Sequence, residues 1–249
     1  MQFTPPLKKG KLLKRYKRFF ADIEYKGEVL TAHTPNTGSL KTVPLADTEC
    51  LFSTSDDPKR KLKYTLEYIF TPTGLAGVNT RTPNTIVHEA LLEGLNDLYE
   101  HVQPEVKINE KTRIDFVLWS WKGKREEKPK KLKYPNYLTD KNLELKFVEV
   151  KNVTMAEGKT AFFPDGVTSR GTKHLEELSK LAKKHTCEIL FTVQREAVEN
   201  FAIAKEIDPI YFKAFHKALK AGVAASAYPV EMGKKKTCLE QASPLKIKI

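Results

Sequence analysis

Short runs of aromatic and β-branched residues alternate with turn-forming clusters over the first eighty positions. The runs fall at 15–20, 28–33, 49–53 and 64–70, and glycine, proline, asparagine and serine are frequent between them. Short strands at such regular spacing are typical of a small barrel or sandwich. Because this stretch has no good helical pattern, we predict a small all-β domain over residues 1–81.

The periodicity changes after residue 81. A Thr82-Pro83-Asn84 start, which suits a helix N-terminus, precedes apolar residues at helical spacing: Ile86, Val87, Ala90, Leu91, Leu95 and Leu98. We expect Pro104 to end this region. Strands are predicted to follow at 105–108 and 113–119.

The rest of the chain continues this alternation. Strand patterns at 145–151 and 188–193 enclose a helix pattern at 174–184. Asp208-Pro209 then opens a last helix with a capping residue followed by proline, and this helix is expected to close before Gly222. Strands that alternate with helices predict an α/β domain over residues 82–249.

A polar insert at 122–142 separates two of the predicted strands. Seven lysines and arginines from Lys122 to Lys133 are opposed by only two acids, Glu126 and Glu127. The insert is either a solvated hairpin loop or a basic flap that contacts phosphates. Charged loops are common whatever the function, so both interpretations stay open.

The charge balance points to a polyanionic partner. The chain carries 43 Lys and Arg against 31 Asp and Glu, for a formal net charge of +12. Such an excess favours nucleic acid first and an anionic membrane second, although a basic protein can also be merely soluble. No run approaches the ~20 apolar residues of a membrane helix. We predict nucleic acid, DNA in the first instance, as the partner, and no membrane.

The cysteines and the N-terminal region bear on the compartment. Cys50, Cys187 and Cys238 are widely spaced and form no C-x-x-C pair, which argues against a zinc ribbon or a disulfide framework. The first residues turn basic without an apolar signal segment. We predict a cytoplasmic protein. The oligomeric state is left open, and a homo-oligomer is one of the alternatives.

The most informative chemistry lies in the strand around Glu149. Strand side chains alternate between faces, so Glu149 and Lys151 project to one side together with Phe147. A second carboxylate, Asp115, stands in the apolar strand that begins at Arg113. If the two strands pair, the carboxylates approach each other, and a divalent cation removes their repulsion.

These groups suit phosphodiester hydrolysis. Mg²⁺ or Mn²⁺ prefers carboxylate oxygens and retained waters, and Asp115 and Glu149 are its predicted ligands. Lys151 is predicted to orient water or stabilise charge on the phosphate. The plainer alternative is a structural ion pair, either Glu149 with Lys151 or Asp115 with Arg113. The spacing alone does not decide between them.

Further contacts with nucleic acid are predicted at a helix start and in the barrel. Backbone N–H groups at a helix N-terminus bind anions, and hydroxyls and cations crowd residues 162–174, although a plain helix cap explains part of this pattern. His174 is expected to be a partner of that loop rather than a metal ligand. The loop at 33–39 is either a turn or a binding loop. The predicted contact residues are Arg15, Lys17, Asn36, Ser39, Arg113, Ser169, Arg170 and Lys173.

One further acid is a candidate. Glu89 lies among apolar residues of the helix predicted to begin at Thr82. It either faces the carboxylate pair and helps to hold the ion, or it is a surface glutamate.

Four motifs together resemble the sugar fermentation stimulation protein (SfsA) family, across nearly the whole chain. They are Pro35-Asn36-Thr37-Gly38-Ser39, Arg113-Ile114-Asp115-Phe116, Val148-Glu149-Val150-Lys151-Asn152-Val153-Thr154, and Phe163-Pro164-Asp165 running through Arg170-Gly171 to His174-Leu175. The chain departs from the family at Thr34, where cysteine is expected, and at Leu40, where methionine is expected. Ile114 also replaces the proline that precedes the aspartate in the broader nuclease pattern.

The resemblance implies an N-terminal OB-fold barrel followed by a PD-(D/E)XK nuclease-like α/β domain. It implies DNA binding and a link to the regulation of sugar catabolism. The nuclease core then maps to Asp115, Glu149 and Lys151, with Glu89 as the helix acid. Three functions follow: a DNA-binding regulator without turnover, an active Mg²⁺-dependent endo- or exonuclease on DNA, and an RNA-processing enzyme of the same chemistry. We predict a DNA-binding protein with a Mg²⁺-binding, nuclease-like centre and leave its turnover open.

Overall fold

The first domain is a closed five-stranded barrel of the OB type. The computed structural model describes residues 1–36, 38–95 and 98–249. The sheet order β3-β2-β1-β4-β5 is closed by a parallel pairing of β3 with β5, and β6 extends it at one side. The strands are β1 (Lys8–Tyr16), β2 (Phe20–Tyr25), β3 (Glu28–His33), β4 (Thr48–Thr54), β5 (Tyr64–Thr71) and β6 (Gly74–Gly77).

The predicted strand at 15–20 is wrong, because a hairpin turn lies inside it. Tyr16 and Phe20 face each other across the β1–β2 ladder. Lys17 and Arg18 between them have positive φ values of 47° and 63°, which make the tight reversal. Turns of this kind favour glycine or asparagine, and their absence hid the turn in the sequence pattern. The lysine-rich β1 was missed for a related reason, since charge masks its alternation.

The second domain is built on a mixed six-stranded sheet. Its order is β15-β14-β12-β9-β8-β7, with β9, β12 and β14 parallel and β7, β8 and β9 antiparallel. These strands are β7 (His101–Lys107), β8 (Arg113–Trp121), β9 (Leu143–Val153), β12 (Thr186–Val193), β14 (Ala224–Met232) and β15 (Thr237–Leu239). A smaller sheet contains β10 (Met155–Glu157), β11 (Thr160–Phe163), β13 (Asn200–Ile203) and β16 (Lys246–Lys248).

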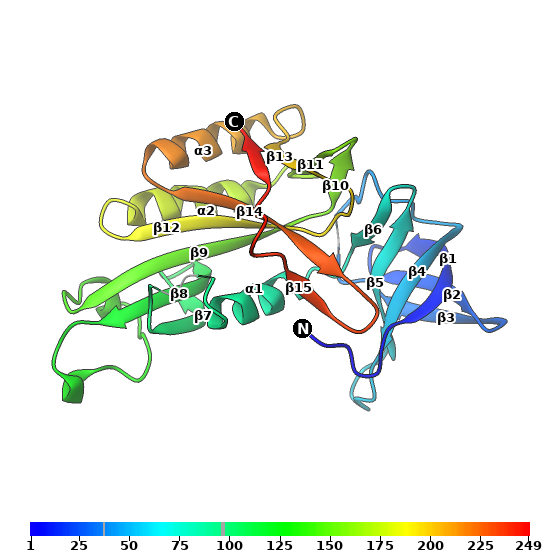
Figure 1. Cartoon of the computed structure of the whole chain (residues 1–249), viewed down its shortest axis with the longest axis horizontal. Helices are drawn as coiled ribbons and strands as arrows, with labels where there is room; N and C mark the ends of the chain where they lie inside the picture. The colour runs from blue at the N-terminus through cyan, green and yellow to red at the C-terminus, as the bar shows by residue number, and fades with distance from the viewer. Residues whose placement is uncertain (37, 96–97) are drawn as a thin grey trace.

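Helices cover both faces of the large sheet (Figure 1). The helices are α1 (Thr82–Leu92), α2 (Ser169–Leu181) and α3 (Pro209–Lys220). Phe147 packs in the core that α2 and α3 share with the sheet, whereas its neighbour Val148 packs in the core beneath α1. The alternation along β9 therefore assigns its odd-numbered residues to the α2 side.

The observed bounds of α1, β7 and α2 correct three details of the sequence prediction. Helix α1 ends at Leu92, and Leu98 is 86% exposed instead of buried. Residues 96–97 of the predicted helix lie outside the described residues, as does Thr37 of the predicted loop. Pro104 lies inside β7, which tolerates it because β7 is an edge strand. Helix α2 begins at Ser169, where Thr168 caps it by accepting from the Gly171 N–H.

The insert at 122–142 is docked rather than fully solvated. It contains the short 3₁₀ turns η1 (Arg125–Glu127) and η2 (Asn136–Leu138). Leu132 and Tyr137 are buried in the core beneath α2 and α3, and the Tyr137 hydroxyl donates to the Lys107 carbonyl at 3.0 Å. The predicted hairpin loop is therefore anchored by two apolar side chains, while its lysines stay outside.

The two domains share a core and a backbone seam. Tyr68 and Leu75 of the barrel pack in the same cluster as Val148 and Val150 of the α/β sheet. The Gly77 N–H donates to the Gln194 carbonyl at 2.9 Å. The barrel and the α/β domain therefore have a fixed relative position.

Candidate metal centre and cleft

Strand pairing brings Asp115 and Glu149 together. The ladder between β8 and β9 ends at the Phe116–Val148 pair, so one step further along the same register sets Asp115 opposite Glu149. Opposed residues of an antiparallel pair project to the same face. Lys151 follows two residues later on that face. All three side chains line one cleft of about 450 Å³.

Asp115 is held by two hydrogen bonds. Its Oδ2 accepts from the Val150 N–H at 2.8 Å, and its Oδ1 accepts from the Asn84 side-chain amide at 2.9 Å. Burial and the negative charge of Glu149 raise the pKa of Asp115 from 3.8 to about 6 and outweigh these bonds. The carboxylate form of Asp115 is thus costly in this setting, and a nearby positive charge would relieve that cost.

Glu149 is in the opposite electrostatic situation. Burial by itself would raise its pKa, but the charge of Lys151 and the contact with His174 hold the pKa below its usual value. Lys151 Nζ lies 2.5 Å from Glu149 Oε1, and His174 Nδ1 contacts the same oxygen. The second oxygen, Oε2, is buried and has no hydrogen-bond partner in the described part of the chain. Glu149 therefore presents one satisfied and one unsatisfied oxygen.

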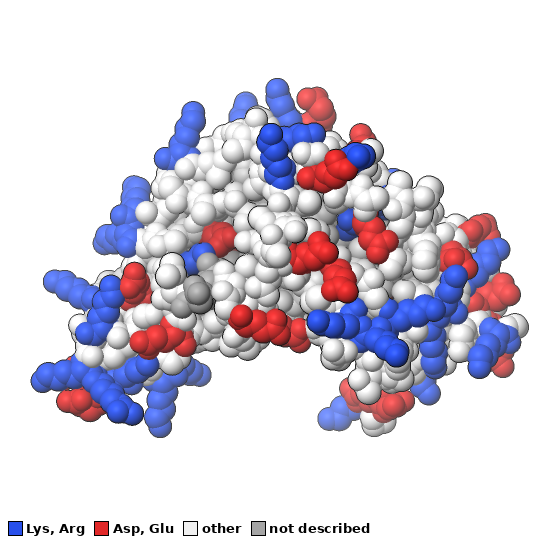
Figure 2. Space-filling model, viewed as in Figure 1, with Lys and Arg blue, Asp and Glu red and all other residues white. Residues whose placement is uncertain are grey.

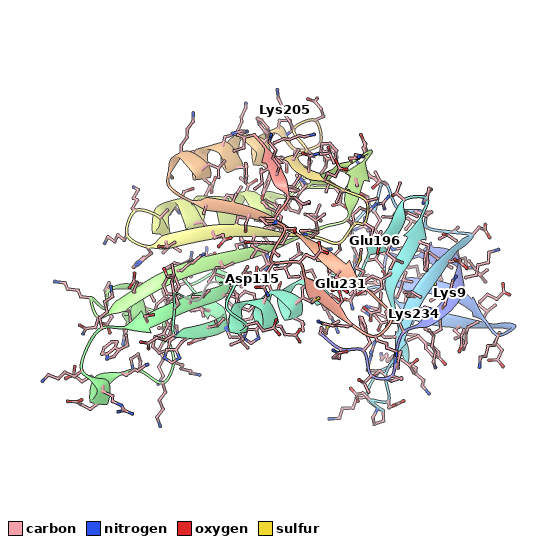
Figure 3. All side chains as sticks on the ribbon, in the orientation of Figure 1. Lys9, Asp115, Glu196, Lys205, Glu231 and Lys234 are labelled. Atoms are coloured by element: carbon pink, nitrogen blue, oxygen red, sulfur yellow. The ribbon has the colours of Figure 1, made fainter. Side chains whose placement is uncertain are left out.

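The cleft collects further groups from three elements. Its walls are formed by Thr80, Arg81, Asn84, Asp115, Glu149, Val150, Lys151, Arg170 and His174. Arg81 and Arg170 are exposed, and they add two cations at the edge of the carboxylate pair. Figure 3 labels Asp115 near the middle of the view, in projection beside β9 and α1. The cleft therefore combines two neighbouring carboxylates with two exposed arginines at its edge.

Glu89 lies elsewhere. Its carboxylate contacts the amino group of Met1, its side chain is 43% exposed, and it is not among the described residues that line the cleft. The residue that α1 contributes is Asn84, one turn nearer the helix start. Asn84 reaches the cleft and Glu89 does not, because the first turn of α1 lies beside the cleft and its later part lies against the N-terminal segment.

Of the other predicted contact residues, three lie in or beside the cleft and five lie elsewhere. Arg170 lines the cleft, and Ser169 and Lys173 are exposed beside it on α2. Arg15 donates to the carbonyl oxygens of Gly38, Arg18 and Asn36, so it braces the barrel loop.

The remaining four lie outside the cleft. Lys17 is in the β1–β2 turn, and Arg113 donates to the Glu105 carbonyl rather than to Asp115. Asn36 accepts from the Gly38 N–H, and Ser39 donates to the Asp165 carbonyl at 3.2 Å.

Thr80, Arg81 and Asn84 line the cleft but are absent from the predicted site residues, although Asn84 was expected at the helix start. His174 was expected only as a partner of its own loop, and the structure shows it on Glu149 instead. The cap at Thr168 was the usable signal for His174. It sets the start of α2 at Ser169, and His174 then falls on the buried face of the helix with Leu175 and Leu178.

The donor set fits a hard divalent cation with water in its shell. Within the described residues there is no group of three or more His, Cys, Asp and Glu that could hold a metal ion. Mg²⁺, however, commonly uses only one or two carboxylates and keeps several waters. The unsatisfied Glu149 Oε2 and the destabilised Asp115 carboxylate are two oxygens of the required kind.

The fold is that of a two-domain protein, with an OB barrel joined to a nuclease-like α/β domain. Family models support the same division: the SfsA N-terminal OB domain matches residues 13–78, and the sugar fermentation stimulation protein RE domain matches residues 81–236. The chain belongs to the sugar fermentation stimulation protein family. In the described part of the chain, no helix has the length and apolar character needed to cross a membrane.

Relatives align over the full chain. The sugar fermentation stimulation protein homolog of Bdellovibrio bacteriovorus is 44% identical and covers 99% of this chain and 100% of its own length. The homolog of Pelagibacter ubique is also 44% identical, with coverage of 100% and 99%. The structure of Pyrococcus furiosus SfsA in complex with Ca²⁺ has a TM-score of 0.79 at 23% identity, over 100% of this chain and 98% of that chain. This last match shows the fold.

Proposed function

We propose that this protein binds nucleic acid, DNA in the first instance, and carries a Mg²⁺-binding, nuclease-like centre at Asp115 and Glu149. One observation carries the proposal: among the described residues, the buried Oε2 of Glu149 has no hydrogen-bond partner, and it lies beside Asp115, whose ionised form is destabilised. Buried polar atoms are almost always paired, and an exception calls for an explanation such as an ion. A divalent cation would satisfy both groups at once.

The cleft residues have separable roles in this proposal. The cation, when bound, supplies Lewis-acid polarisation of a phosphate and a lowered pKa for a bound water. Asp115 and Glu149 provide its oxygens. His174 and Lys151 hold the other oxygen of Glu149 and so fix the orientation of its carboxylate. Lys151 also keeps a positive charge at the place where a reacting phosphate gains negative charge.

The charge around the cleft supports a phosphate backbone as ligand. Arg81 and Arg170 are exposed at its edge, and the whole chain carries a net charge of +12. Figure 2 shows Lys and Arg side chains gathered towards both ends of the face in view, over the barrel and over the far end of the α/β domain. A backbone bound by such cations releases counterions, so its affinity depends steeply on salt.

The comparisons add chemical support. The Pyrococcus furiosus SfsA structure contains Ca²⁺, a hard cation that, like Mg²⁺ and Mn²⁺, takes oxygen ligands. The three cysteines are free, which accords with the reducing compartment expected of a cytoplasmic protein.

The second candidate function is active, metal-dependent hydrolysis of DNA or RNA. The presence of Lys151 next to both carboxylates favours it, since a metal-binding site alone has no need of that ammonium group. The close pairing of Lys151 with Glu149 favours binding without turnover, because the ammonium is already engaged.

A cleavage assay separates these functions. Labelled single- and double-stranded DNA and RNA are incubated with Mg²⁺, Mn²⁺, Ca²⁺ or EDTA, and metal affinity is measured in parallel by calorimetry. We expect Asp115→Asn and Lys151→Met to abolish any cleavage, and Asp115→Asn to weaken metal binding as well. Asp56→Asn, at an exposed loop position, is the matched control. Nucleic-acid binding without metal uptake would overturn the centre, and metal uptake without nucleic-acid binding would overturn the partner.

A further inference from the structure

A second cavity lies directly beside the metal cleft. It has a volume of about 130 Å³ and is lined by Asn36, Thr80, Asn152, Val153, Thr154, Phe162, Phe163 and Asp165. Thr80 lines both spaces. Strand β9 runs from one into the other, with Glu149 to Lys151 in the cleft and Asn152 to Thr154 in the cavity. The two spaces are therefore neighbours around the end of β9.

The polar groups of the cavity are suited to a neutral ligand. In the described part of the chain, no lysine or arginine lines the cavity, and the one charged group among its lining residues is the carboxylate of Asp165. A phosphate would be repelled there, in contrast to the neighbouring cleft, where Arg81 and Arg170 lie. The two spaces thus differ in kind: the cleft suits the anionic backbone, and the cavity suits an uncharged polar group.

The cavity also offers a fixed donor and a fixed acceptor. Asn152 Oδ1 accepts from the Gln194 side-chain amide at 2.7 Å, which turns the NH₂ group of Asn152 away from Gln194. Gln194 is fully buried, which restricts the movement of this pair of side chains. Asp165 is positioned by the barrel, since its Oδ2 accepts from the Leu40 N–H at 3.4 Å and its carbonyl accepts from Ser39. Asn152 supplies the donor and Asp165 the acceptor.

The size and the aromatic wall narrow the ligand further. A cavity of about 150 Å³ holds a single benzene ring, so 130 Å³ suits one six-membered ring better than a fused pair. Phe162 lines the cavity with an aromatic side chain of the kind on which nucleobases stack, whereas Phe163, its neighbour on β11, packs against Phe191 and Tyr211. Cytosine offers an exocyclic amine, for which an aspartate is the matching acceptor.

We propose that this cavity is a subsite for one unpaired pyrimidine base, with cytosine favoured, adjoining the phosphate bound in the metal cleft. The subsite rests on the proposed function, because that function supplies the nucleic acid. It makes single-stranded or locally unpaired DNA the substrate class, since a base inside a duplex cannot enter a pocket of this kind.

The test compares homopolymers. Fluorescence anisotropy with labelled oligo(dC), oligo(dT) and oligo(dA), in Ca²⁺ at fixed salt, gives three affinities for the full-length protein. We expect oligo(dC) to bind about tenfold more tightly than oligo(dA), with oligo(dT) between them. Asp165→Asn replaces an acceptor with a group that also donates, while its amide oxygen can still accept from Leu40. We expect this variant to prefer oligo(dT) over oligo(dC).

Two controls keep the outcomes separate. Asp56→Asn changes the same charge at an exposed barrel loop, and its order of preference is expected to equal that of the wild type. Thermal unfolding of each variant shows whether it is folded. Equal affinity for the three homopolymers, or an unchanged preference in folded Asp165→Asn, overturns the subsite while the metal centre stands. Absence of binding both to these oligonucleotides and to duplex DNA overturns the proposed function itself, whereas binding to duplex DNA alone overturns the subsite.

Discussion

Asp115 and Glu149 line the same cleft from neighbouring strands, yet their surroundings shift their pKa values in opposite directions. Burial and the charge of Glu149 destabilise the ionised form of Asp115. Glu149 is more deeply buried than Asp115, but the charge of Lys151 and the contact with His174 stabilise its ionised form. At neutral pH, ionised Glu149 therefore stabilises the folded protein, whereas ionised Asp115 destabilises it. Neutralising each should therefore change stability with opposite sign.

Replacing Asp115 with asparagine should stabilise the metal-free protein at neutral pH. The folded pKa of about 6 exceeds the ordinary 3.8, so the penalty for ionised Asp115 is absent below pH 3.8 and complete above about pH 6. Two pKa units correspond to a gain of up to about 3 kcal/mol. Thermal unfolding in EDTA at pH 4 and pH 8 measures it, with a higher melting temperature for D115N expected only at pH 8. Equal melting temperatures at pH 8 would contradict this.

Replacing Glu149 with glutamine should have the reverse effect. The folded pKa is depressed, so ionised Glu149 contributes stability at neutral pH that is lost as the pH falls through the folded pKa. The variant leaves Lys151 without its buried counter-charge, and the loss of one partner of a buried pair typically costs about 3–5 kcal/mol. Chemical denaturation at pH 7 tests this against Glu24→Gln, an exposed strand position. A loss no larger than that of the control would refute a compensated charge at Glu149.

Two positions of α1 should differ in their effect on metal binding. Asn84→Ala removes a hydrogen bond that favours ionised Asp115, so its pKa rises further and metal affinity should fall several-fold at pH 6 to 7. Glu89→Gln should leave metal affinity unchanged, because Glu89 contacts Met1 outside the cleft. Titration calorimetry with Mn²⁺ compares the two. A loss of Mn²⁺ affinity in E89Q but not in N84A would instead support Glu89 as the metal-binding helix acid predicted from the sequence.

Arg81 and Arg170 should contribute to nucleic-acid affinity without regard to base. If each contacts one phosphate, each alanine substitution should lower the slope of log K against log salt by about 0.7–0.9. Anisotropy with a labelled oligonucleotide over a salt series measures the slope. Lys205→Ala, whose side chain Figure 3 labels far from Asp115 in the view, is the control. Unchanged slopes in both arginine variants would show that the phosphate backbone of the nucleic acid binds to another surface of the protein.

The seam between the domains should be sensitive at Gly77. A Cβ atom there would meet Gln194 Oε1 at 2.5 Å and Gln194 Cδ at 2.7 Å. Gln194 is fully buried and holds Asn152, so it has little room to move. We expect Gly77→Ala to cost about 1–3 kcal/mol of stability. Gly166→Ala, which meets no atom within 4 Å, is the control for denaturation measurements.

Local patterns were sufficient to predict most long elements of this chain. Alternation located β3, β5, β9 and β12, and the Asp208-Pro209 cap located the start of α3, which the structure confirms. Such patterns act within a few residues, so the sequence records them directly. The same alternation set Glu149 and Lys151 on one face. Short strands such as β10, β13 and β16 were missed because runs of three or four residues carry no clear period.

Only the tertiary structure decided which of these residues meet. That Asp115 stands opposite Glu149 depends on the register of β8 against β9, and that Asn84 rather than Glu89 reaches the cleft depends on how α1 enters it. His174 meets Glu149 because α2 packs on one face of the sheet. These contacts join residues tens of positions apart in the chain, and packing energy, which no local pattern encodes, selects among the alternatives.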